Sequence, residues 1–351
     1  MSRHCQPHNI PEPCYYCEKG LPSFETLTAR IQTLEDRVRE LETGDRTLLL
    51  MDRNTTNYVV RMGGVGDIII LTSSLKALKE QHPDRPLVLA TLGDNIPLLE
   101  NAPFIDGLVS VSNWGDAKFR HKFDLRYAVE PPGIGEGKLP WDDYMTRDRS
   151  DLFDRLLGVK SKKEFYVPVD KTIVAAMLDR LSTLPRPFIG IAATSKSPVR
   201  TIPPEYIEPL ARLIKIGTGG TVFIFGVSVK WNQEVKEIQG SRIINMVDSL
   251  NLREAMAFIS IMDLIVGADS APVHAAGALK VPCLALFGNI HPRTRVTYYP
   301  TVKALFPEGE LPCIPCWDKT DLDCREGKFG GPCMRLFTPD RIMAELKNVF
   351  P

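Results

Sequence analysis

The stretch that decides the fold is residues 57–67, which read NYVVRMGGVGD. Residues 58–62, YVVRM, predict a strand, and the glycines after it predict a tight turn into a helix over 68–79. Further strands are predicted downstream, at 87–90, 108–111 and 123–127. Strands that alternate with helices indicate parallel βαβ units in an open, twisted sheet.

The same pattern starts again after residues 185–187, Pro-Arg-Pro, which we interpret as a hinge. A helix opened by proline is predicted at 204–216. The strands of this half are predicted at 188–192, 221–226, 263–267 and 283–288. The sequence therefore predicts an α/β protein with two facing, doubly wound, Rossmann-like halves. Ligands of such sheets bind outside the carboxyl ends of the strands, so we expect the site in the cleft between the halves.

The composition is that of a globular protein. The chain has 351 residues, 44% of them hydrophobic and 25% charged, and 43 basic residues balance 43 acidic ones. Because the charges balance, no whole-protein field attracts nucleic acid, and we do not expect nucleic acid as a partner. No apolar run approaches the roughly 18–20 residues of a membrane-spanning helix, and no secretory signal opens the sequence. We therefore expect a cytoplasmic protein whose thiols stay reduced.

The N-terminal region differs from the two halves. Residues 1–21 are rich in cysteine and histidine and show little periodicity. Within residues 22–45, apolar side chains recur at alternating spacings of three and four, which is typical of a short coiled coil. These residues are Phe24, Leu27, Ile31, Leu34, Val38 and Leu41. We expect a homo-oligomer that forms through residues 22–43; an amphipathic helix that lies on its own protein is the alternative.

The cysteines fall into two groups. In a reducing compartment a group of four with one Cys-x2-Cys pair would suit a structural zinc ion, and this chain has such a group in Cys313, Cys316, Cys324 and Cys333. Disulfides or free thiols remain alternatives, because the second half of the group lacks a tight pair. A weaker candidate site at the N-terminus would use Cys5, Cys14, Cys17 and His8 (or His4).

The glycine-rich turn after the first strand is the first candidate site. Gly64 and Gly66 let backbone amides approach a ligand closely, and the N-terminus of the following helix favours an anion. Asp67 stands where this helix starts and would point into the cleft. The alternative interpretation is that Asp67 only stabilises the dipole of its own helix.

Two further candidate segments belong to the second half. Residues 267–277, GADSAPVHAAG, place Asp269 at the end of a strand and the small residues Ser270 and Ala271 in the first turn of a helix. The free N–H groups of such a turn suit phosphate, and His274 lies about one turn further on. Residues 193–203, ATSKSPVRTIP, put hydroxyls and cations on a strand-to-helix loop, which predicts a diphosphate clamp; a solvated loop is the alternative. The two cations of this loop are Lys196 and Arg200.

Residues 57–112 and 187–300 resemble the two halves of the lipopolysaccharide heptosyltransferase family, glycosyltransferase family 9, which has the GT-B fold. The resemblance is most specific in DLIVGADSAPVHAA at 263–276, and it includes the Gly66-Asp67 turn and the segment NAPFID at 101–106. It implies that Asp67 is the general base for an acceptor hydroxyl. It also implies that Thr194, Ser195 and Arg200 bind the donor phosphates, and that Asp269, Ser270, Ala271 and His274 bind the donor and stabilise the leaving diphosphate.

Several positions depart from the family pattern. Ile202 replaces a common tryptophan, Ala271 replaces a glycine, and Lys230 stands about where an acidic residue usually holds the ribose. The nucleoside of the donor therefore stays open.

The resemblance implies a glycosyltransferase that moves a sugar from a nucleotide-sugar donor to a saccharide or other hydroxyl acceptor. Inversion is expected because Asp67 is one candidate base with no evident second nucleophile, and no cofactor is expected for catalysis. The alternatives are a GT-B-fold nucleotide-sugar epimerase and a non-catalytic assembly protein with a retained ligand cleft. The predicted domains are a Cys/His-rich segment (1–21), a coiled-coil helix (22–45), an acceptor domain (55–184), a nucleotide-sugar domain (185–305), and a Cys-rich segment with the C-terminal helix (306–351).

Overall fold

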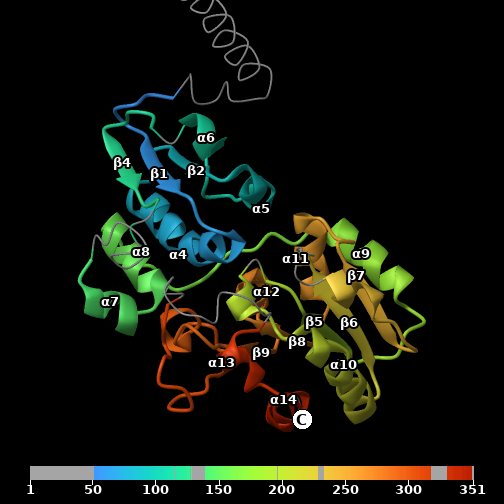
Figure 1. Cartoon of the computed structure of the whole chain (residues 1–351). Coiled ribbons are helices and arrows are strands. Elements are labelled where there is room, and N and C mark those ends of the chain that lie inside the picture. Colours follow the sequence, from blue (N-terminus) through green and yellow to red (C-terminus); the bar gives the residue numbers. More distant parts are fainter. Residues whose placement is uncertain are drawn as a thin grey trace, which may run out of the picture. The chain divides into compact units, whose positions relative to one another are not determined.

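The computed structural model describes residues 51–349, except 115, 127, 129–138, 196, 228–232 and 318–329. The chain divides into two units, residues 1–52 and 53–351. The predicted Cys/His-rich segment, the coiled coil and Cys324 lie outside the described residues. The second unit contains all the helices and strands of the described residues (Figure 1).

The first half is built on a four-stranded parallel sheet of order β3-β2-β1-β4. Its strands are β1 (Asn57–Arg61), β2 (Leu87–Thr91), β3 (Gly107–Ser110) and β4 (His121–Asp124). Every residue of β1 and β2 is buried, because both faces of the sheet are covered, and this explains why the interior positions of both strands are apolar. The helices of this half are α4 (Val65–Gln81), α5 (Ile96–Leu99), α6 (Val111–Trp114), α7 (Trp141–Thr146) and α8 (Arg149–Leu157).

The second half is a six-stranded parallel sheet of order β10-β9-β8-β5-β6-β7. Its strands are β5 (Phe188–Ala192), β6 (Thr221–Gly226), β7 (Ile243–Val247), β8 (Leu264–Ala268), β9 (Cys283–Leu286) and β10 (Val302–Leu305). The chain runs outward from β5 in one direction and then returns to β8 on its other side. A ligand crevice is expected where strand order reverses in this way, and here that point lies between β5 and β8.

Helices cover both faces of the second sheet. They are α9 (Lys171–Arg180), α10 (Pro204–Thr218), α11 (Leu252–Ser260), α12 (Ala271–Ala278), α13 (Pro332–Arg335) and α14 (Pro339–Leu346). The buried faces of α10 and α14 share one hydrophobic cluster, and those of α11 and α12 belong to another. Helix α9 packs on α11. None of the helices in the described part of the chain is long and apolar enough to cross a membrane.

The predicted α/β class with two parallel sheets is confirmed, and each predicted strand is present within a few residues of its expected position. The helix after β1 begins at Val65 rather than at residue 68, so Asp67 lies inside its first turn. The sequence analysis did not predict β7, β10 or α8.

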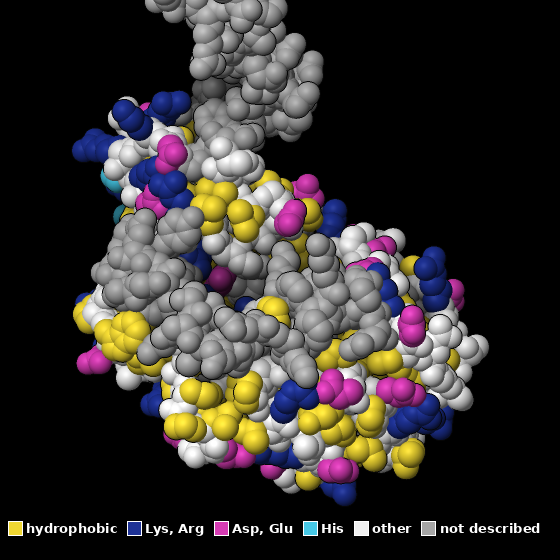
Figure 2. Space-filling model, viewed as in Figure 1, with side chains coloured by type: hydrophobic (Ala, Val, Ile, Leu, Met, Phe, Trp, Pro, Cys, Tyr) yellow, Lys and Arg dark blue, Asp and Glu magenta, His cyan; other side chains and the backbone are white. Residues whose placement is uncertain are grey.

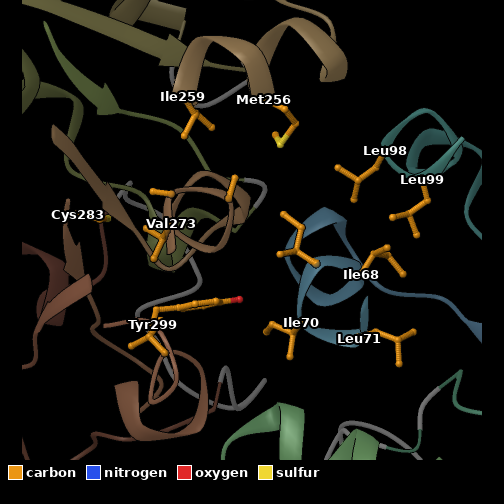
Figure 3. Close-up of a cluster of buried hydrophobic side chains, with 14 of the residues drawn as sticks. Ile68, Ile70, Leu71, Leu98, Leu99, Met256, Ile259, Val273, Cys283 and Tyr299 are labelled. Atoms are coloured by element: carbon orange, nitrogen blue, oxygen red, sulfur yellow. The ribbon is translucent and has the colours of Figure 1, made fainter. Parts of the chain in front are cut away.

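One cluster of buried apolar side chains contains residues of both halves (Figure 3). Helix α4 packs directly against α12. Ile70 of α4 points toward Tyr299, whereas Ile68 on the other side of the helix points toward Leu98 and Leu99 of α5; these five side chains and Val273 of α12 are each at most 3% exposed. Since burial of one such side chain contributes about 1.5–3 kcal/mol, this contact fixes α4 and α12 against each other.

Candidate functional site

A cavity of ≈ 480 Å³ lies between the two halves, at the carboxyl ends of β1, β5 and β8. Its volume falls within the range of roughly 300–1,000 Å³ that is usual for small-molecule sites. Figure 2 shows a hollow on this face in which acidic and basic side chains are visible between hydrophobic ones. The cavity is lined by all the candidate residues of the two halves, namely Gly64, Gly66, Asp67, Thr194, Ser195, Arg200, Asp269, Ser270, Ala271 and His274.

Asp67 presents its carboxylate to the cavity from the first turn of α4, with a fifth of its side chain exposed. Arg61 Nη2 donates to Oδ2 at 3.3 Å, and Arg149 Nη1 donates to Oδ1. Burial alone would raise the pKa of Asp67, but the charges of Arg149 and Arg61 and the hydrogen bond from Arg149 outweigh it. The pKa of this carboxyl therefore lies well below its usual range.

The two arginines that hold Asp67 differ in their surroundings. Arg61 is 1% exposed, and its Nη1 donates to the carbonyl oxygens of Leu125 and Arg126, each at 2.9 Å. Arg61 does not line the cavity, whereas Arg149 does. Arg61 is therefore bound to the backbone of the residues that follow β4, whereas Arg149 faces the cavity.

Helix α8 places Arg149 through contacts with both halves. Asp148 caps the helix by accepting from Ser150 N at 2.9 Å, and its second oxygen accepts from Thr297 N at 3.1 Å. Asp151 accepts from Tyr298 Oη at 3.0 Å. Thr297 and Tyr298 belong to the loop between β9 and β10. The start of α8 is thus tied to the second half, and Arg149 stands at the junction.

The opposite wall centres on Asp269, which directly follows β8 and is 2% exposed. It accepts from Arg200 Nη1 at 3.2 Å, and His274 Nε2 lies 3.6 Å from its other oxygen. Burial would raise the pKa of Asp269, but the neighbouring imidazole of His274 and the charges of Arg200 and Arg295 hold it well below the usual range. Asp269 therefore stays ionised and orients Arg200 and His274.

The N-terminus of α12 opens toward the cavity beside Asp269. Ser270 is its N-cap residue, but its hydroxyl donates to Ala268 O at 2.9 Å and makes no capping bond to the helix. Ser270, Ala271 and Pro272 all line the cavity. Backbone N–H groups at such an uncapped helix start are suited to an anion.

Thr194 and Ser195 complete this wall directly after β5. Both are at most 8% exposed and line the cavity. Gly226, at the end of β6, has φ +135 and lies so close to Thr194 that a Cβ there would collide with the threonine side chain. The backbone next to Thr194 therefore requires glycine, both for its conformation and for space.

Arg295 adds a further cation between the two walls. It is 6% exposed, its Nη1 donates to Thr294 O at 2.9 Å, and its guanidinium lies 4.7 Å from the ring centre of Trp317. Burial, and then the charge of Arg149, lower the pKa of Arg295 to about 9. Arg149 and Arg200 repel the charge of Arg295, and the carboxylates of Asp67 and Asp269 do not fully offset this repulsion. An anion that binds in this part of the cavity would therefore be stabilised.

His274 lies at the contact between the halves as well as at the cavity. Its ring packs edge-on to Tyr299 at 5.8 Å, and a Cβ added at Gly66 would lie 2.6 Å from its Cδ2. Gly66 is thus needed for the close approach of α4 to α12. The other end of the cavity is apolar and is lined by Phe225, Val227, Leu250, Leu252, Met256 and Ile259.

Residues 137–324, more than half of the chain, match the family model of glycosyltransferase family 9 (heptosyltransferase). The chain belongs to glycosyltransferase family 9. A curated relative is lipooligosaccharide heptosyltransferase 2 of Campylobacter jejuni (serotype O:2), which is 25% identical over 134 residues. That alignment covers 36% of this chain and only 40% of the relative's length.

Solved structures show the same fold. A family 9 glycosyl transferase from Veillonella parvula matches with a TM-score of 0.65 at 17% identity, over 85% of this chain and 98% of its own. E. coli ADP-heptose lps heptosyltransferase II matches with 0.62 at 16%, over 84% and 98%. The iron-containing dodecameric glycosyltransferase TibC of enterotoxigenic E. coli matches with 0.61 at 15%, over 84% and 76%. The expected GT-B-like heptosyltransferase fold is thereby confirmed.

The sequence analysis missed Arg149 and Arg295 as parts of this family 9 cavity, and also Asp94 and Trp317. Asp94 follows β2, is exposed, and has no ion pair within the described part of the chain. No local motif marks these four residues. The single available signal was the position of Asp94 just beyond a predicted strand, at the edge where parallel-sheet ligands bind.

The C-terminal cysteines lie next to the cavity wall. Cys316 and Cys333 are buried and Cys313 is exposed. Cys316 N and Trp317 N donate to Asn289 O at 2.9 and 3.0 Å, and Cys333 Sγ would lie 2.6 Å from a Cβ at Gly288. Among the described residues, which do not include Cys324, no group of three or more metal-ligating side chains is assembled.

Proposed function

We propose that this family 9 protein transfers a sugar from a nucleotide-sugar donor to an acceptor hydroxyl, with inversion at the anomeric carbon. One observation carries the proposal: a carboxylate on one wall of a single cavity faces an uncapped helix N-terminus and arginines on the other. Asp67 would serve the acceptor, and Arg200, Arg295 and the start of α12 would bind the donor diphosphate.

The chemistry is a single displacement. The acceptor oxygen forms a bond to the anomeric carbon while the bond from that carbon to the phosphate oxygen breaks. The electron pair of the broken bond stays on the diphosphate, and the acceptor proton passes to Asp67. Cations and backbone N–H groups that are already in place around the leaving diphosphate would stabilise the charge that develops there.

We propose an ADP-sugar, with a heptose as the sugar, for the donor. The E. coli enzyme is named ADP-heptose lps heptosyltransferase II, and TibC is described in complex with ADP-D-beta-D-heptose. The apolar end of the cavity, around Phe225 and Met256, suits a flat base next to the diphosphate subsite. The acceptor would be a saccharide or another hydroxyl compound.

For the C-terminal cysteines we propose a structural metal ion, zinc in the first instance, held by Cys313, Cys316, Cys324 and Cys333. The approach of Cys316 and Cys333 to the same turn at 288–289 supports this set, and TibC is described as iron-containing. Four thiolates suit either ion. Elemental analysis of the purified full chain should find about one equivalent of zinc or iron, and Cys333→Ser should lose it.

The test of the transferase proposal begins with thermal shifts against ADP, UDP and GDP, where ADP should stabilise the protein most. Turnover of ADP-heptose is then measured for the wild type, Asp67→Ala and Asp94→Ala. Because a positioned general base contributes about 10²–10⁴-fold, Asp67→Ala should lose turnover by that factor and still bind ADP. Asp94→Ala is the control for loss of a carboxylate in the same cavity. Equal loss in both variants, or full turnover by Asp67→Ala, would contradict the role of Asp67.

A further inference from the structure

Two arginines donate to the carboxylate of Asp67. This arrangement fixes the position of the carboxylate, but it does not favour proton transfer to it. Hydrogen bonds and positive charges that act on an ionised carboxylate stabilise it and make it a weak base. A general base works best when its pKa is close to the working pH. The charged groups that act on Asp67 are Arg61 of β1, Arg149 of α8 and, further away, Arg295 of the loop after β9. For Asp67 to act, one of these cations has to change partner.

Only one of the two contacting arginines is placed to do so. Arg61 donates to two backbone carbonyls and does not line the cavity. Arg149 is 8% exposed, lines the cavity, and shares it with Thr194, Ser195 and Arg200 of the opposite wall. A long side chain in this position can turn from Asp67 toward a ligand in the middle of the cavity.

The charge around Arg149 favours such a turn when an anion arrives. Arg149 and Arg200 both act to lower the pKa of Arg295, so each of them repels the charge of Arg295. A diphosphate carries negative charge in the geometry that guanidinium groups bind in pairs of hydrogen bonds. A bound diphosphate would relieve the repulsion on Arg295, whereas Asp67 accepts a hydrogen bond from Arg149 and not from Arg200 or Arg295 among the contacts of the described residues.

We infer that Arg149 is a shared positioning residue that holds Asp67 before the donor binds and passes to the donor's diphosphate when it binds. Asp67 is then left paired with Arg61, still oriented, and able to accept the acceptor's proton. The exchange makes the base effective only when the donor is present. The inference rests on the proposed function, because it needs a diphosphate in the cavity.

Competition between Asp67 and the diphosphate for Arg149 can be measured by calorimetric titration of the full chain with ADP and with inorganic pyrophosphate. If Asp67 competes for Arg149, Asp67→Asn should tighten binding of both ligands roughly tenfold, the value of one charge-assisted hydrogen bond. In the Arg149→Gln background the same change should give no more gain than Asp94→Asn gives, since only the general loss of a negative charge from the cavity is left. In the Arg149→Lys background part of the gain should return, because the cation is kept.

Asp94→Asn is the matched control, since it removes an equal charge from the same cavity without touching the pair. A gain for Asp67→Asn that persists undiminished without Arg149, or that only equals the gain for Asp94→Asn, would overturn the exchange while leaving the donor proposal intact. Failure of ADP and pyrophosphate to bind the wild type would overturn both. If Arg149→Gln does not fold, absence of any gain in the Arg149→Lys background refutes the inference instead.

Discussion

The two walls of the cavity each present an aspartate beyond the end of a strand, and each aspartate is paired with arginine. Asp269 is 2% exposed and follows β8 directly, with Arg200 and His274 as its partners. Asp67 lies in the first turn of α4 with a fifth of its side chain exposed, next to Arg61 and Arg149. We relate the proposed roles to this difference in exposure: both aspartates line the cavity, but the nearly buried carboxylate of Asp269 orients its neighbours, whereas the more exposed carboxylate of Asp67 can contact an acceptor and take its proton.

The largest expected effect is on the Asp269 wall. Asp269→Ala would remove the carboxylate that pairs with Arg200. Because Arg200 is 28% exposed, we expect a loss at the lower end of the range of about 3–5 kcal/mol that a fully buried ion pair costs when one partner is removed. Urea denaturation should show this loss, together with a weaker response to ADP. Asp67→Ala should cost less in stability because water reaches that carboxylate. If Asp269→Ala lost less unfolding free energy than Asp67→Ala, Asp67 rather than Asp269 would be the carboxylate that organises its surroundings.

Much of this contrast could be predicted from the sequence, and the reason is local. Thr194, Ser195 and Asp269 lie within three residues of the end of a strand, and Asp67 lies in the first helical turn after β1; parallel sheets bring such positions together at one edge. Strand β7 contains Asn245 and β10 contains Lys303, which interrupt their apolar runs. These strands were therefore missed. Helix α11 was missed as well, but its start does carry a local signal, the capping box formed by Asn251 and Glu254.

Arg149 and Arg295 could not be predicted for a different reason. Neither follows a strand within a motif, and arginine is common on surfaces, so nothing local separates them from solvated residues. Their places in the cavity come from long-range contacts, such as that of Asp148 with Thr297 and that of Arg295 with Trp317. The cations that balance the two aspartates are therefore a property of the tertiary structure.

A smaller effect is expected where the walls touch. A methyl group at Gly66 would lie 2.6 Å from His274 Cδ2, so α4 and α12 would have to move apart. Gly66→Ala gains up to about 1 kcal/mol of helix propensity, but overpacking costs about 1–3 kcal/mol. We expect a net loss of about 1 kcal/mol by urea denaturation, with weaker ADP binding.

Gly64→Ala is the control for Gly66→Ala, because nothing lies within 4 Å of a Cβ at Gly64. Its stability should stay within about 0.5 kcal/mol of the wild type, because the loss of a favourable N-cap glycine is roughly offset by the lower conformational entropy of alanine in the unfolded chain. If both alanine variants were equally stable, the contact between Gly66 and His274 would not hold the walls together.

The smallest expected effect is the pH dependence of the Asp67 wall. The folded state holds the pKa of Asp67 below its usual range, so its contribution to stability is present above about pH 4 and is lost as the pH falls through the lower folded-state value. The difference in unfolding free energy between wild type and Asp67→Asn should therefore be largest near pH 7 and shrink below about pH 4. Denaturation at a series of pH values measures it. A difference that grows toward acid would mean that Asp67 is protonated more readily in the folded chain, and the ion pairs with Arg61 and Arg149 would then not be what holds it.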